Sequence, residues 1–151
     1  MVNTMDIKVL AYGPGPLSLV EEQALVEQFR SGEDQSVEVQ IAPRVMYRAS
    51  DVEKGIVGLQ MYVEYVHQEQ KIISYGFVLT LQVNEWAGFD PGSKSEEEIR
   101  SFFRPIWEKT FIFASGALVS RLQTEPLQQL VLSSLHVNDE FMNLVRVERE
   151  E

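Results

Sequence analysis

Cysteine is absent from this chain, and histidine occurs only twice. Without cysteine there is no thiol nucleophile, no disulfide and no thiolate ligand for zinc or an iron–sulfur cluster. His67 and His136 have no partner histidine or carboxylate at metal-ligand spacing, so we expect a solvated or ordinarily packed position for each. The sequence therefore gives no support for a metal or any other cofactor.

Long apolar runs and an excess of basic residues are also missing. No run approaches the roughly 20 apolar residues that a membrane-spanning helix needs, and residues 1–10 lack the pattern of a secretory signal. The chain carries 13 basic and 23 acidic residues, a formal net charge of −10, which repels polyphosphate and argues against nucleic-acid binding. We expect a cytoplasmic protein that does not insert into membranes.

Catalytic motifs are lacking as well. Glu96-Glu97-Glu98 opens a predicted helix, where negative charge complements the helix dipole. Gly13-Pro14-Gly15-Pro16 is not a phosphate loop, because no Lys-Ser/Thr follows and proline has no amide to donate. No Gly-x-Ser-x-Gly elbow is present. The sequence predicts a binding protein rather than an enzyme.

What is present is the composition of one globular domain. Hydrophobic residues make up 44% of the 151 positions, and a chain of this length buries enough surface to fold without metal or disulfide. We therefore expect a single domain over residues 1–151.

Three segments alternate apolar and polar residues with a period of two, which predicts strands with one buried face. These segments are residues 37–41, 57–65 and 73–83. The polar residues 67–71 suit an antiparallel hairpin between the last two. A fourth short strand is expected at residues 6–12, and the four strands are expected to form a meander.

The residues after Trp86 predict one long interrupted helix. Ser95 and Glu98 form a capping box ahead of an apolar run. Pro105 lacks the amide that a helix interior needs, so we expect a kink or break there before the helix resumes over residues 107–123. A stretch of small residues within it permits close approach of another backbone, either a helix–helix contact or a subunit interface. The candidate interface is Ala114, Ser115, Gly116, Ala117 and Leu118.

Two shorter helices are predicted from their caps. Ser18, with Glu21 three residues later, predicts a helix over residues 18–30. Val137-Asn138-Asp139 is expected to supply the N-cap of a short C-terminal helix, which is followed by a frayed charged tail at residues 148–151. The apolar face of the C-terminal helix is expected to be Phe141, Leu144 and Val145. The fold class is α+β: a four-stranded antiparallel sheet packed against a long interrupted helix and a short C-terminal helix.

The serial order of segments from residue 73 to residue 145 matches a known pattern. Val78-Leu-Thr-Leu-Gln-Val-Asn-Glu-Trp-Ala-Gly-Phe89 resembles the last strand and crossover loop of the SecB family of bacterial protein-export chaperones. Residues 111–122 are similar to that family's main helix, and residues 129–137 to the connection before its final helix. The resemblance implies a homo-oligomer, a dimer or dimer of dimers, that binds unfolded or pre-secretory polypeptides without ATP.

The chain also departs from the family's pattern. Ile112-Phe113-Ala114-Ser115 stands where the family has Pro-Tyr-Ala-Arg, and Glu125-Pro126-Leu127 where it has Gly-x-Phe-Pro. The acidic residue with which the family docks the translocation ATPase corresponds to Gln82. Whether this chain engages that partner is therefore open.

A chaperone of this kind needs exposed apolar surface, and negative charge to stay soluble while offering it. Trp86 and Phe89 flank the crossover loop and are expected to line a groove. Phe102 or Phe103 is expected in the core, because aromatics at helical spacing are mostly buried. The full set of candidate polypeptide-binding residues is Trp86, Phe89, Phe102, Phe103, Trp107 and Met142.

Two alternatives stay open. One is a dedicated adaptor whose groove holds a single partner. The other is a small ligand-binding α+β domain or enzyme, such as a hot-dog-like thioesterase, which would need an acid or base at the N-terminus of its long helix. Only Glu96–Glu98 could serve there.

Overall fold

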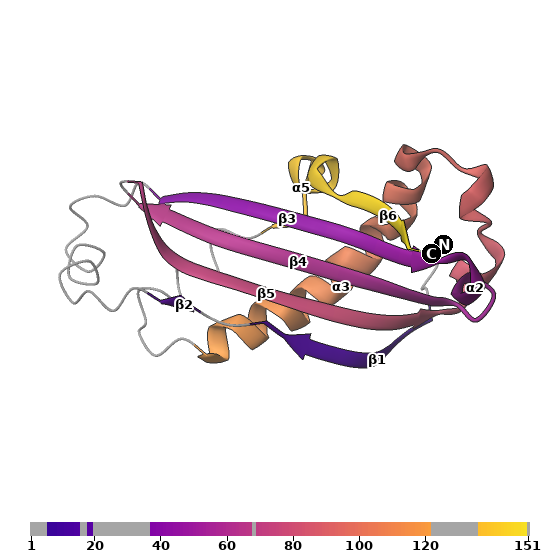
Figure 1. The fold of residues 1–151 in the computed structure, drawn as a ribbon, viewed down its shortest axis with the longest axis horizontal. Helices are drawn as coiled ribbons and strands as arrows, with labels where there is room; N and C mark the ends of the chain where they lie inside the picture. Colours follow the sequence, from indigo (N-terminus) through magenta and orange to yellow (C-terminus); the bar gives the residue numbers. More distant parts are fainter. Residues whose placement is uncertain (1–5, 16–17, 20–36, 68, 122–135, 151) are drawn as a thin grey trace.

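The computed structural model describes residues 6–15, 18–19, 37–67, 69–121 and 136–150. Its secondary structure falls into a sheet of long strands and a small number of helices (Figure 1). The strands are β1 (Ile7–Pro14), β2 (Ser18–Leu19), β3 (Val37–Arg48), β4 (Ile56–His67), β5 (Gln70–Val83) and β6 (Arg146–Glu150). The helices are α2 (Ala49–Val52), α3 (Glu96–Arg121) and α5 (Asp139–Leu144), with 3-10 turns η1 (Asn84–Gly88) and η2 (Pro91–Ser93).

The sheet has the order β1-β5-β4-β3-β6, and β2 pairs with a separate part of β5. Strands β3, β4 and β5 form an antiparallel meander, as the sequence predicts. The first strand does not precede β3 in this meander, because β1 lies antiparallel along β5 on the far side. Strand β6 runs parallel to β3 at the opposite edge. The α+β class is confirmed, whereas the sheet is mixed and six-stranded rather than four-stranded and antiparallel.

The core lies between one face of this sheet and helix α3. The alternation in β4 and β5 is confirmed, because every odd residue in residues 57–65 and 73–83 is at most 3% exposed. Helix α3 contributes a buried stripe at helical spacing. That stripe comprises Ile99, Phe103, Ile106, Trp107 and Leu118. Figure 1 shows α3 running obliquely behind the strands.

Helix α3 is continuous through Pro105, so of the kink or break that the sequence predicts, the break does not occur. Proline removes the hydrogen bond to the carbonyl four residues earlier, and its ring crowds that carbonyl, which belongs to Ser101. Ser101 is exposed, so water can bond that carbonyl. Packing of Ile106 and Trp107 against the sheet holds the helix together on the other side.

Two further predictions are wrong because the segments concerned pair with strands that are distant in the sequence. Ser18–Leu19 is extended and pairs with Ser74 and Ile73 of β5, so it does not begin a helix. The remainder of the helix predicted over residues 18–30 lies outside the described residues, as do the predicted helix end and connection at residues 122–135. The predicted frayed tail is strand β6, which an ion pair between Arg44 Nη2 and Glu148 Oε1 (2.5 Å) ties to β3.

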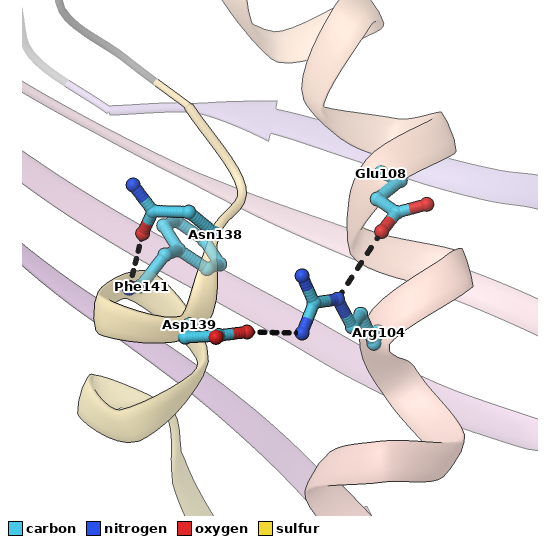
Figure 2. Close-up of polar contacts among 5 residues, drawn as sticks. All are labelled: Arg104, Glu108, Asn138, Asp139 and Phe141. Carbon is cyan, nitrogen blue, oxygen red and sulfur yellow. Dashed lines mark hydrogen bonds and ion pairs between the residues drawn. The ribbon is translucent and has the colours of Figure 1, made fainter.

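Helix α5 is capped as predicted and is fastened to α3. The Asn138 side chain accepts a hydrogen bond from the Phe141 amide at 2.9 Å (Figure 2). Arg104 Nη1 reaches Asp139 Oδ1 at 2.6 Å. Within α5 the predicted apolar face is partly wrong, because Leu144 is 51% exposed while Met142 is 7% exposed and joins the core.

Candidate functional site

The crossover between β5 and α3 contains the two short 3-10 turns η1 and η2. Asp90 separates η1 from η2 and adopts a left-handed conformation with φ of 56°, which aspartate tolerates better than most residues. Its carbonyl accepts hydrogen bonds from the Ser93 amide (3.1 Å) and hydroxyl (3.0 Å). The predicted capping box then starts α3. The Glu98 amide donates to Ser95 Oγ at 3.1 Å, and the Ser95 amide to Glu98 Oε1 at 3.3 Å.

Trp86 is the centre of an aromatic cluster that the crossover folds onto the start of α3. Its side chain is 0% exposed. The cluster packs Phe103 and Tyr47 edge-on against it, at centroid distances of 5.0 and 5.4 Å. Phe89 stacks on it at 5.5 Å, and Phe102 lies at 5.5 Å. Aromatic pairs in these arrangements stabilise beyond the area they bury.

The cluster separates the candidate aromatics into two groups. Trp86, Phe103 and Trp107 are at most 1% exposed and Met142 is 7% exposed. These four side chains therefore belong to the hydrophobic core and do not line a groove. Phe89 and Phe102 are only partly buried, and their rings lie 4.4 Å apart. Of the six residues, these two are the ones whose rings are partly open to a binding partner.

A hollow of about 390 Å³ lies beside the crossover. It is bounded by Ala87, Gly88 and residues 90–92 of the crossover, by α2 and by Tyr47. Since Tyr47 also packs on Trp86, one wall of the hollow continues into the aromatic cluster. Glu53, Asp90 and Arg149 add charge. The hollow is therefore suited to an apolar side chain of an extended segment whose polar backbone stays near the charged residues.

No protein-family model, curated protein or solved structure matches this chain.

The candidate interface on α3 is divided by the fold. Leu118 is 2% exposed and belongs to the core, so it does not face outward. Gly116 is exposed, and a Cβ built on it would meet nothing within 4 Å. Ile112, which the prediction did not include, lies one turn earlier and is 77% exposed. Among the described side chains of residues 111–118, Ile112 and Gly116 are the exposed ones; the side chains of Ala114 and Ala117 are outside the described residues, and Ser115 is partly buried.

Gln82 lies on the face of the sheet away from α3. Its neighbours across the strands are Lys8 of β1 and Ile56 of β4, and its Nε2 donates to the Lys54 carbonyl at 3.4 Å. This position therefore combines a neutral side chain with a cation on the adjacent strand. It does not offer the carboxylate with which the SecB family docks the translocation ATPase.

The acidic start of α3 has structural partners. Glu98 completes the capping box with Ser95. Glu96 Oε2 pairs with Arg100 Nη2 at 3.2 Å, and Arg100 Nε also donates to the Val145 carbonyl at 2.8 Å. The carboxylate of Glu98 therefore caps α3, and that of Glu96 pairs with the arginine that attaches α3 to the segment after α5.

Sequence reasoning missed the apolar side chains on the open face of the sheet. Tyr62 is 42% exposed and Val78 is 38% exposed, and both are even-numbered residues on strands whose odd residues are buried. The period-two pattern placed them on the outward face, so the signal was available.

No helix in the described ranges is long and apolar enough to cross a bilayer.

Proposed function

We propose that this protein is a SecB-like, ATP-independent chaperone that binds non-native polypeptide segments in the cytoplasm. The observation that carries the proposal is the crossover. A rigid aromatic base of Trp86 and Phe103 supports the half-buried pair Phe89 and Phe102. An open hollow lies alongside, with Tyr47 as its wall.

This arrangement is suited to binding polypeptides that have no sequence motif in common. Contact between an aromatic ring and an apolar side chain depends on buried area and needs no matched hydrogen bond. Completing the burial of one half-buried phenylalanine is worth about 1 kcal/mol. Such weak contacts release clients readily, and several copies of the site in a homo-oligomer would raise the avidity. The net charge of −10 would keep the loaded protein soluble.

Unfolded or pre-secretory polypeptides are the proposed partners, and a dimer or dimer of dimers is the proposed assembly. The exposed Ile112 and Gly116 on α3 support a subunit contact there. The translocation ATPase is not proposed to dock at Gln82, because the neutral side chain and the adjacent Lys8 differ from the acidic site of the SecB family.

Aggregation suppression without ATP tests the proposal. The purified protein is added to a refolding substrate, and light scattering gives both the aggregation and the mass of the assembly. We expect near-stoichiometric suppression by the oligomer. Replacing both Phe89 and Phe102 by serine should raise the concentration needed by roughly tenfold or more, since two contacts of about 1 kcal/mol are lost.

Val78→Ser is the matched control, because it removes exposed apolar surface from the opposite face of the sheet. Far-UV circular dichroism and the assembly mass establish that each variant is folded. Suppression by the Phe89/Phe102 variant equal to that of the unchanged protein would rule out the crossover site. A folded protein that fails to suppress aggregation, and is instead saturated by one partner or one small molecule, would favour the adaptor or ligand-binding alternative.

A further inference from the structure

A second hollow, of about 340 Å³, lies on the open face of the sheet at its β3 edge. Figure 1 shows α5 at this edge, next to β3, and β6 continuing from it. While Phe141 and Met142 of α5 point into the core, Leu144 is half exposed and lines the hollow. We call this hollow the β3-edge notch. It is floored by residues 41–43 and walled by Tyr62, Leu144 and Arg146.

The apolar walls of the notch are held in place from outside it. The Tyr62 hydroxyl donates to Glu64 Oε1 at 2.7 Å, and Lys71 Nζ lies 2.9 Å from the same oxygen. The phenol oxygen is thereby engaged along β4, which leaves the ring as an apolar wall. Opposite it, the Leu144 side chain is 51% exposed at the end of a capped helix. A large apolar side chain placed between them would cover both.

The charge at the rim is unbalanced. Arg44 and Arg146 are direct neighbours across the parallel strands β3 and β6, an arrangement in which like charges repel. Arg44 is satisfied by Gln60 (3.2 Å) and by Glu148 (2.5 Å). Within the part of the chain that the structure describes, Arg146 has no hydrogen bond or ion pair from its side chain. One uncompensated cation therefore stands at an apolar hollow in a chain whose net charge is −10.

We propose that the β3-edge notch docks an acidic–apolar segment of a partner protein. One large apolar side chain enters between Tyr62 and Leu144, and an adjacent carboxylate of the same segment pairs with Arg146. Arg44 is already paired with Glu148, so the attraction of the carboxylate to Arg146 gives the notch a preference that apolar area alone would not. This surface is separate from the crossover, and its occupant is a defined partner rather than an unfolded client.

Methyl NMR on the full chain tests the proposal and also applies to an oligomer. The probes are two blocked synthetic peptides, acetyl-Gly-Ser-Asp-Leu-Ser-Gly-amide and the same peptide with Asn in place of Asp. We expect the Asp peptide to shift the methyl signals of Ile41 and Leu144. We expect it to bind about two- to fivefold more tightly than the Asn peptide, the range of an exposed ion pair, with the difference shrinking as salt is added.

Arg146→Gln should abolish the preference for the Asp peptide. Lys109→Gln changes the net charge equally at an exposed position on α3 and should preserve it. Equal binding of the two peptides by the unchanged protein, no shift at either methyl, or shifts confined to Val52 at the crossover hollow would each overturn the proposal. Aggregation suppression should be unchanged in Arg146→Gln, so failure here is distinguishable from failure of the proposed chaperone function.

Discussion

Replacing Trp86 by alanine is the sharpest test of how the crossover is built. The Trp86 side chain is fully buried and contacts four other aromatic rings, so its removal should lower the free energy of unfolding by about 3–5 kcal/mol. Phe89 is only partly buried, and Phe89→Ala should cost about 1–2 kcal/mol. Against a total stability of about 5–15 kcal/mol for a natural domain, the first change is severe and the second is tolerable.

Urea unfolding followed by far-UV circular dichroism measures the difference. With a denaturant slope of about 2 kcal/mol per molar, the midpoint should fall by about 2 M for Trp86→Ala and by less than about 1 M for Phe89→Ala. Trp86→Phe retains an aromatic ring at the centre of the cluster and should recover much of the loss. A midpoint for Trp86→Ala no lower than that for Phe89→Ala would refute the assignment of Trp86 to the core.

Three other outcomes follow from local contacts. Burial, together with the hydrogen bond to the Tyr75 hydroxyl, raises the pKa of Tyr12 from 10.0 to about 12. The folded chain therefore holds the phenol proton more tightly than the unfolded chain does. The resulting contribution to the free energy of unfolding should be complete below pH 10 and lost as the pH rises through 12. Phenolate absorbance and unfolding of Tyr12→Phe against pH measure this, and a normal titration would contradict it. Ser95→Ala should lower the free energy of unfolding by about 1 kcal/mol through loss of the α3 cap, measured by thermal or urea unfolding. Asn138→Ala should cost a similar amount at α5, and an unchanged stability in either variant would mean that its cap is not formed.

The parts of the fold that the sequence predicted are those set by local chemistry. The alternation in β4 and β5 is explicit because one face of each strand is wholly buried. The cap at Asn138 and the capping box at Ser95 each depend on residues three positions apart. Strand β3 was predicted too short because Pro43 interrupts its pattern, although the strand continues to Arg48.

What the sequence did not predict depends on partners far along the chain. Residues 146–150 have the composition of a solvated tail, and only the pairing with β3 makes them a strand. Ser18–Leu19 is a strand because it pairs with Ile73 and Ser74 of β5, and no residue near Ser18 in the sequence indicates this pairing. Similarly, Trp86 is buried because α3 places Phe103 against it, so its depth could not be inferred from a position beside a loop.

The position of β6 has a consequence for the order in which the protein folds during synthesis. Strands β3, β4 and β5 are consecutive and can pair as soon as residue 83 is available, whereas the β3 edge waits for residues 146–150. Contacts of such large sequence separation form late, and an unpaired edge strand is a template for association with other chains. The nascent sheet therefore has an interval in which residues 44–48 of its β3 edge are uncovered. Ribosome-bound chains that stop short of β6 should be the ones most prone to aggregate.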